Sequence, residues 1–178
     1  MTTPSISPID IEHLQKIRSS VSEFISTCAS RLDKKGNLVL DIAPQDWEGA
    51  RKHFVNSEVK TLDIDLNSKA DYIADITKLN VDIIPSDYFD FVLCTEVLEH
   101  TLNPFKAADE IYRILKPGGF VGITVPLNFR IHGPTPDCWR FTKYGLESVL
   151  AQFRNIEISE IESDRFLFPI QYRVIAQK

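Results

Sequence analysis

Two short apolar runs joined by one helix-like segment constrain this chain more than any other feature. Residues 89–94 and 120–125 are rich in β-branched and aromatic side chains, which is typical of buried strands. Between them, Asn103 followed by Pro104 is a typical helix start, with an N-cap side chain and proline at the first helical position. Residues 116–119, KPGG, are expected to end this helix and turn the chain. The arrangement predicts a right-handed βαβ unit with parallel strands.

Further strands and helices are predicted on either side of this unit. We expect strands at residues 38–42, 59–65 and 72–76. A first helix is expected to begin at Asp10 and run to about Leu32, and Phe105, Ala108 and Ile111 recur at helical spacing on the second helix. Strands alternating with helices predict an α/β fold with a mainly parallel sheet.

Composition and charge narrow the class of protein. A length of 178 residues fits one domain, which we place at residues 10–178 behind a flexible tail of residues 1–9. The net charge of -5 argues against a nucleic-acid partner. The three cysteines are scattered without the Cys or Cys/His spacing of a zinc site, so we expect no metal and a reducing, cytoplasmic location. We see no secretory signal and no apolar run of membrane-spanning length, and the oligomeric state stays open.

Three aspartates mark the ends of successive predicted strands. Asp41, Asp63 and Asp75 lie in or at the carboxyl end of different strands. In parallel sheets this edge holds the ligand crevice. Any one such aspartate is more often a turn or helix cap. Three on successive strands favour a binding site for a ligand with hydroxyl or amine groups.

The order of motifs resembles one family. LVLDI, TLDID, ADIT, FDFVLCTEVLEH and EIYRILKPGGFVGITVP, spread over residues 38–125, look like the class I S-adenosylmethionine-dependent methyltransferases, and most like their type 11-like subgroup. The resemblance implies a Rossmann-like, seven-stranded, mainly parallel sheet with helices on both faces. Residues 155–161 and 172–176 would be the last two strands, and the seventh strand would be antiparallel and lie between the fifth and sixth. The implied activity is transfer of a methyl group from S-adenosyl-L-methionine to a small-molecule or glycan-type acceptor.

The resemblance also implies roles for residues that match the family's motifs. Asp63 matches the carboxylate that binds both ribose hydroxyls of the cofactor, with Asp65 as the alternative if the register differs by two. Asp75 matches the acidic residue near the adenine amine, and Ile76 would pack on the adenine ring. Asp41 would help to orient the first loop and the methionine end of the cofactor.

The segment after the fourth strand is expected to form the floor of the same site. Cys94, Thr95 and Glu96 would lie near the methionine moiety or the acceptor. Cys94 is also expected to be a small buried residue of the core. For Glu99 and His100 two roles stay open, a structural one that holds the loop and helix start, and a catalytic one.

The first loop departs from the family's pattern. The family usually has D-x-G-x-G there, because glycine lets the backbone approach the cofactor closely. This chain has Ala43, Pro44 and Gln45 instead, and Gly49 comes too late for the same turn. Either the loop takes another path, on which Ala43 and Gln45 contact the cofactor, or cofactor affinity is weakened or lost. The second alternative describes a non-catalytic binding or regulatory protein with the same fold.

The loop after the fifth strand carries the candidate acceptor chemistry. Residues 126–142 are dense in His, Asp, Trp and Arg and broken by Pro and Gly, which predicts a structured loop at the functional edge. His132 is the candidate general base, or else a loop histidine bonded to a backbone carbonyl. Arg140 is expected to bind an acidic group of the substrate, or to pair with Asp137 and pin the loop. Trp139 would either line the acceptor site or anchor the loop in the core.

A third class of function is weighed and set aside. Tyr112 and Lys116 have the Y-x-x-x-K spacing of some nicotinamide-dependent reductases. No G-x-G-x-x-G follows any predicted strand, so the pair is interpreted as a coincidence of helix surface residues.

Overall fold

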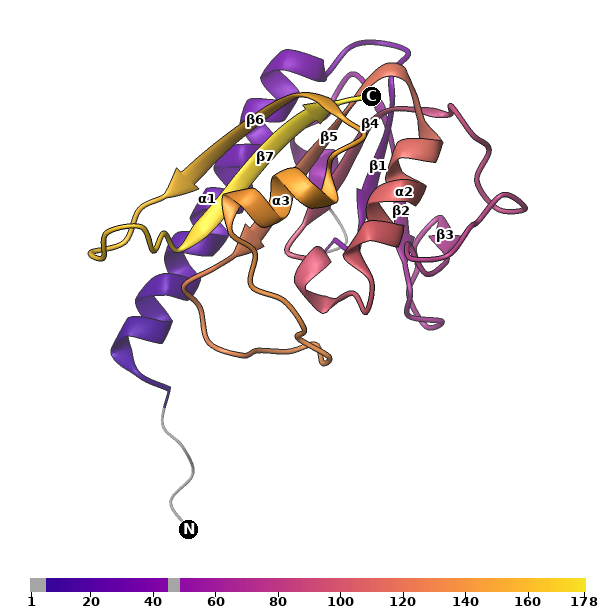
Figure 1. Cartoon of the computed structure of the whole chain (residues 1–178). Helices are drawn as coiled ribbons and strands as arrows, with labels where there is room; N and C mark the ends of the chain where they lie inside the picture. Colours follow the sequence, from indigo (N-terminus) through magenta and orange to yellow (C-terminus); the bar gives the residue numbers. More distant parts are fainter. Residues whose placement is uncertain (1–5, 45–48) are drawn as a thin grey trace.

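The structure, a computed structural model, describes residues 6–44 and 49–178. A single sheet forms its centre, and its strands are β1 (Leu38–Ile42), β2 (Glu58–Asp63), β3 (Tyr72–Ile73), β4 (Phe89–Thr95), β5 (Leu115–Pro126), β6 (Arg154–Ile161) and β7 (Gln171–Gln177). The seven strands follow the order β3-β2-β1-β4-β5-β7-β6 (Figure 1).

Strands β1 to β5 are parallel, and β7 runs antiparallel between β5 and β6. The mainly parallel Rossmann-like sheet with an inserted antiparallel last strand is therefore confirmed. The register places Ile42 of β1 beside Leu62 of β2 and Cys94 of β4, and Cys94 beside Ile123 of β5. The carboxyl ends of these strands thus lie at one edge of the sheet, where ligands bind in folds of this kind.

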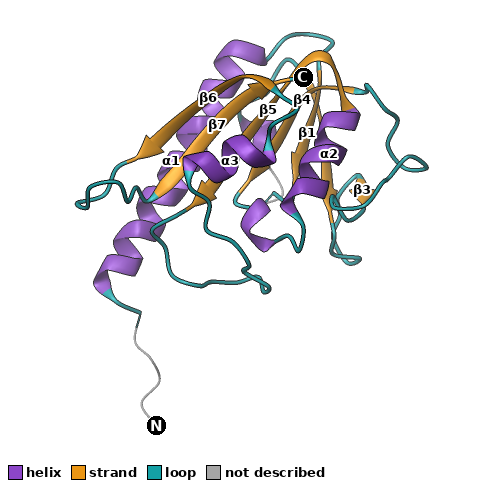
Figure 2. Cartoon of the chain, viewed as in Figure 1, coloured by secondary structure: helices purple, strands orange, loops and turns teal. Residues whose placement is uncertain are grey.

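Helices cover both faces of the sheet. They are α1 (Pro8–Leu32), α2 (Pro104–Ile114) and α3 (Lys143–Val149), with the short 3-10 helices η1 (Gly49–Lys52) and η2 (Leu98–His100). Figure 2 shows α1 behind the sheet and α2 and α3 in front of it. Phe24 and Cys28 of α1 pack on Phe91 of β4 on one face, and Ile111 of α2 and Leu146 of α3 belong to the larger core on the other.

The first helix begins earlier than predicted. Ser7 is its N-cap and accepts a hydrogen bond from the Asp10 backbone N–H at 3.2 Å, so the helix begins at Pro8. Ser-Pro is the same start signal as Asn-Pro in α2, where Asn103 caps the helix as predicted. Residues 8 and 9, which were expected in the N-terminal tail, thus belong to α1. In α2, Ala108 and Ile111 face the core as expected, whereas Phe105 is 49% exposed.

The KPGG segment does not form the expected helix stop and turn. Helix α2 ends at Ile114, and strand pairing starts at once, since Leu115 lies beside Phe89. The two glycines sit at an irregularity in this pairing, where Gly118 has a φ of +83° and a Cβ on Gly119 would lie 3.0 Å from the Asp90 carbonyl oxygen. KPGG is therefore a bulged start of β5.

Two predicted strands also end sooner than expected. β2 ends at Asp63 and β3 comprises only Tyr72 and Ile73, because short turns held by aspartate side chains follow both. Among the described residues, no helix is long and apolar enough to cross a membrane.

Candidate functional site

The site is built at the carboxyl edge of the sheet, beginning with Asp41 in β1. This carboxylate is 2% exposed, and its Oδ2 accepts a hydrogen bond from the Ala50 backbone N–H at 2.8 Å. Gly49 lies directly against it, with a φ of +44°, and a Cβ at this position would clash with Asp41 Oδ2 and lie 2.8 Å from the Pro44 Cβ. Asp41 therefore holds the start of η1 against β1, and Gly49 provides the space.

The first loop keeps a glycine-like backbone without the glycine. Ala43 has a φ of +51°, in the left-handed region, and its N–H donates to the Leu62 carbonyl oxygen at 2.7 Å. The backbone here thus adopts the conformation that the family's glycine would allow. Gln45, the residue expected to contact the cofactor, lies outside the described residues.

The end of β2 presents a carboxylate at this edge. Asp63 Oδ1 accepts a hydrogen bond from the Asp65 backbone N–H at 2.9 Å, which closes a tight turn. The described part of the chain offers Oδ2 of the same carboxylate no hydrogen-bond partner. Asp65, the alternative ribose ligand, is exposed within the turn, where its Oδ1 accepts from the Asn67 N–H.

After β3, the next pair of expected cofactor residues forms another turn. Asp75 Oδ1 accepts from the Thr77 backbone N–H at 2.9 Å and from the Thr77 hydroxyl at 2.7 Å. Ile76 is 5% exposed and belongs to the larger core. Asp75 remains partly exposed at the edge, whereas Ile76 offers little open surface for an adenine ring.

The end of β4 carries the residues expected to form the floor of the site. Cys94 is fully buried in the core, and burial raises the pKa of its thiol, so this side chain is a packing residue. Glu96, with a φ of +53°, points toward β7, where its Oε1 accepts from Gln171 Nε2 at 2.8 Å. Burial raises the pKa of the Glu96 carboxyl to about 7. Gln171 in turn accepts a hydrogen bond from Ser20, which ties this floor to α1.

A second carboxylate follows in η2. Glu99 is 0% exposed, and neither of its side-chain oxygens has a hydrogen-bond partner among the described residues. Burial first, and then the nearby Glu96 carboxylate, raise the pKa of Glu99 well above its usual range. Its backbone carbonyl accepts from the N–H groups of Cys138 and Trp139, so η2 also anchors the loop after β5.

That loop is pinned by an internal ion pair. Arg140 forks the Asp137 carboxylate, with nitrogen to oxygen distances of 2.5 and 2.7 Å, and also donates to the carbonyl oxygens of Phe129 and Arg130. The Asp137 side chain is fully buried, and the Arg140 hydrogen bonds lower its pKa to about 2. Of the two expected roles for this pair, the structure shows the loop-pinning one.

The pinned loop presents His132 and Trp139. His132 Nδ1 lies 3.0 Å from Asp137 Oδ2, and its backbone N–H donates to the same oxygen at 2.9 Å. Burial lowers the pKa of the His132 imidazole, against the opposing effect of Asp137. Trp139 Nε1 donates to the Thr101 carbonyl oxygen at 2.8 Å, yet the side chain is 39% exposed. Trp139 thus anchors the loop and still presents ring surface.

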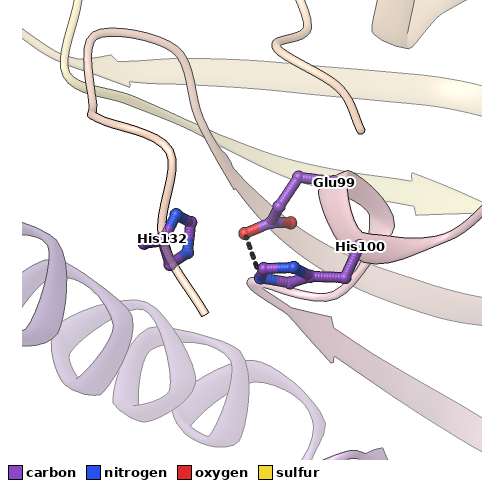
Figure 3. A group of neighbouring side chains, drawn as sticks. All are labelled: Glu99, His100 and His132. Carbon is purple, nitrogen blue, oxygen red and sulfur yellow. Dashed lines mark ion pairs between the residues drawn. The ribbon is translucent and has the colours of Figure 1, made fainter. Parts of the chain in front are cut away.

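Figure 3 shows Glu99, His100 and His132 converging from η2 and the loop after β5. One possible metal-ligand atom of each lies within 4.8 Å of those of the others. No metal site was predicted from the sequence here, because His132 lies far along the chain from the adjacent Glu99 and His100. Only the two neighbours in VLEH carried a sequence signal.

The Tyr112 and Lys116 pair is not assembled for reductase chemistry. Tyr112 lies on α2 and packs on Phe153, with ring centroids 5.1 Å apart. Lys116 lies in β5, not on the helix as expected, and its Nζ pairs with Asp90 at 2.8 Å. The two side chains serve separate packing and pairing roles.

The chain matches a known protein family over more than half of its length. The family described as "Methyltransferase domain" matches residues 24–123, from α1 through most of β5. The chain belongs to this family. The matched span contains every expected cofactor residue, and it ends before the loop that holds His132 and Arg140.

Solved structures show how the methyltransferase domain relates to others. A SAM dependent methyltransferase from Archaeoglobus fulgidus aligns with 20% identity and a TM-score of 0.67, over 92% of this chain and 97% of that one. The Haemonchus contortus phosphoethanolamine N-methyltransferase 2, in complex with S-adenosyl-L-methionine, aligns with 16% identity and a TM-score of 0.65, over 88% and 52%. The [4+2]-cyclase SpnF aligns with 14% identity and a TM-score of 0.66, over 89% and 82%. No curated protein matches the chain at a significant level.

The surface hollows that the described residues line include two at opposite edges of the sheet. One, of about 430 Å³, lies beside the loop after β5 and is lined by residues that include Ile6, Phe129, Ile131 and His132. The other, of about 630 Å³, lies at the opposite edge, where β1, β2 and β5 begin. Only the first adjoins the candidate site.

Proposed function

We propose that this protein binds S-adenosyl-L-methionine at the carboxyl edge of β1, β2 and β3 and transfers its methyl group to a small-molecule or glycan-type acceptor. The observation that carries the proposal is the Asp63 carboxylate at the end of β2, within the matched family span. Its Oδ1 closes a turn while Oδ2 remains available to accept from ribose hydroxyls. Membership of the family supports the cofactor.

Two other expected cofactor residues, Asp75 and Asp41, suit roles around this contact. Asp75 is partly exposed beside the end of β3, which suits a role near the adenine amine. Asp41 acts through the loop it holds, by its hydrogen bond from Ala50. Methyl transfer is an in-line displacement, so the domain must align the acceptor, methyl carbon and sulfur and exclude water.

Within this proposal His132 is the candidate general base. Its Nδ1–H donates to the Arg130 carbonyl oxygen at 3.3 Å, with Asp137 Oδ2 3.0 Å from the same nitrogen, which leaves the Nε2 lone pair to accept the proton of an acceptor hydroxyl or amine. The low pKa of the imidazole keeps it unprotonated near neutral pH. The hollow of about 430 Å³ beside His132 is of a size for a small acceptor. His132→Ala is therefore expected to lower turnover and spare cofactor affinity.

The non-catalytic alternative is favoured by one specific feature, the first loop. Ala43 holds a backbone conformation that costs a non-glycine residue about 1 kcal/mol, and Pro44 has no N–H to donate to a cofactor. A methyltransferase-like fold also occurs in the cyclase SpnF, so the fold alone does not assign methyl transfer.

Calorimetric titration with S-adenosylhomocysteine tests the proposal. The wild-type protein is expected to bind, and Asp63→Ala should weaken binding by about 1.5–3 kcal/mol, because a hydrogen bond to a charged group is lost. Asp65→Ala is the matched control, since Asp65 is an exposed carboxylate of the same turn. It should leave the affinity unchanged.

Each contrary result has a definite meaning. Absence of binding at millimolar S-adenosylhomocysteine would refute both the proposed cofactor site and the proposed methyltransferase activity. Unchanged affinity in Asp63→Ala would refute the ribose assignment. Binding without transfer of an isotope-labelled methyl group to any of a panel of hydroxyl, amine and glycan acceptors would favour the non-catalytic alternative.

A further inference from the structure

The Glu99 carboxylate is the starting point. It is 0% exposed, and both of its oxygens lack a hydrogen-bond partner among the described residues. An ionised carboxylate that is buried without partners is strongly disfavoured, so such a group calls for an explanation. A bound cation would provide that explanation, because it would balance the charge of the Glu99 carboxylate and accept its lone pairs.

The two neighbouring imidazoles are oriented so that each can offer Nε2 as a ligand to the same cation. His100 Nδ1 lies 2.9 Å from the Pro136 carbonyl oxygen, and His132 Nδ1 lies 3.0 Å from Asp137 Oδ2. A carbonyl oxygen and an ionised carboxylate only accept, so each Nδ1 carries the proton and each Nε2 keeps its lone pair. Metal-binding histidines are held in the same way, with the other ring nitrogen donating to a carboxylate or carbonyl.

The distances place the three groups near one coordination sphere. The ligand atoms lie within 4.8 Å of one another, and His100 Nε2 lies 3.8 Å from Glu99 Oε1. Two atoms that each bind one ion at about 2.1 Å lie at most about 4.2 Å apart. Around a tetrahedral ion, ligand atoms lie about 3.4 Å apart, so movements of up to about 1 Å per group would bring all three onto one ion.

The surrounding charge also favours a cation. Glu96 and Glu99 are two neighbouring carboxyl groups, and the nearby guanidinium of Arg140 is already engaged by Asp137. A divalent ion bound here would balance the charge of these carboxyl groups as they lose their protons to bind it.

We propose that Glu99, His100 and His132 bind one divalent transition-metal cation. Two imidazoles with one carboxylate suit Zn²⁺, Fe²⁺, Co²⁺ or Mn²⁺, whereas Mg²⁺ and Ca²⁺ prefer oxygen ligands. Three protein ligands leave coordination positions open for a water molecule or an acceptor oxygen.

A bound cation would also change how the acceptor is deprotonated in methyl transfer, and this part of the proposal alone rests on the proposed function. A cation on Nε2 occupies the lone pair that a general base would use. In the loaded protein, the cation would instead lower the pKa of a bound acceptor hydroxyl, and the proton would leave to water. Cation binding itself does not depend on methyl transfer.

The test is a calorimetric titration of the chelator-stripped full chain with Zn²⁺, together with visible absorption after adding Co²⁺. We expect one ion per chain and no thiolate-to-cobalt absorption, because no cysteine is a ligand. Glu99→Gln, His100→Ala and His132→Ala should each weaken binding by roughly 10- to 100-fold or more. Glu99→Gln keeps the side-chain shape, and circular dichroism confirms that each variant is folded.

Two control variants make the result specific. His53→Ala removes a histidine outside the group, and Cys138→Ser removes the exposed thiol, so both should bind Zn²⁺ like the wild type. Absence of binding, or wild-type affinity in the three ligand variants, would overturn the proposal. S-adenosylhomocysteine titration of the metal-free protein is the separate readout, so a failed metal site does not count against the cofactor site.

Discussion

At the scale of single residues, the first loop needs a glycine at a different position from the one in the family's pattern. Ala43 keeps a positive φ where the family pattern has glycine, and Gly49 lies against Asp41 and Pro44 where a Cβ does not fit. The carboxylate at Asp41 could be predicted from its place in the strand. The role of Gly49 could not, because it depends on the loop folding back onto β1.

Gly49→Ala is therefore expected to destabilise the protein by about 2–3 kcal/mol, since the new Cβ meets Asp41 and Pro44 and the backbone has a left-handed φ. Chemical unfolding measures the change. Gly145→Ala in α3 is the control, because its Cβ would make ordinary contact at 3.7 Å. That variant should be neutral or more stable by up to about 1 kcal/mol. Equal stability of both variants would show that the Gly49 contact is not tight.

At the scale of elements, local signals were predictable and long-range ones were not. The Asn103–Pro104 helix start and the pairing of Asp137 with Arg140 depend on neighbouring residues, and both are present. The meeting of His132 with Glu99 depends on how the loop after β5 returns to η2, which no local pattern encodes. KPGG was misinterpreted because glycines serve a bulged strand as readily as a turn.

The ion pair that pins this loop predicts a pH dependence. The folded pKa of Asp137 is about 2, below its ordinary value, because Arg140 stabilises the charged form. Its contribution is therefore fully present above the unfolded pKa and is lost as the pH falls from about 4 to about 2, and it amounts to about 2 kcal/mol. Asp137→Asn should lose this stability at neutral pH, and the difference from wild type should vanish near pH 2.

Denaturant unfolding of both proteins in chelator-containing buffer across this pH range measures the effect. Asp87→Asn is the matched control, since it removes one partner of an exposed pair with Lys178, and it should change stability by no more than about 0.5 kcal/mol. A pH-independent difference between Asp137→Asn and wild type would show that the loss comes from packing and not from the charge.

At the scale of the whole molecule, the sheet was the most predictable feature. Apolar runs such as those of β4 and β5 are long and β-branched, so their burial follows from the sequence. The insertion of β7 between β5 and β6 came from the resemblance, because strand order is not encoded in periodicity. The ends of β2 and β3 were placed too late, since Asp63 and Asp75 divert the backbone into turns.

The same architecture brings Asp41, Asp63 and Asp75 to one edge, which is the basis of the proposed cofactor site. The structure of the protein with S-adenosylhomocysteine bound, determined by X-ray crystallography, tests this most directly. We predict ribose hydroxyls on Asp63 Oδ2 and the adenine amine near Asp75, with the sulfur facing Glu96 and the loop that holds His132. Ligand bound at the hollow where β1 and β2 begin, or at neither edge, would contradict the account.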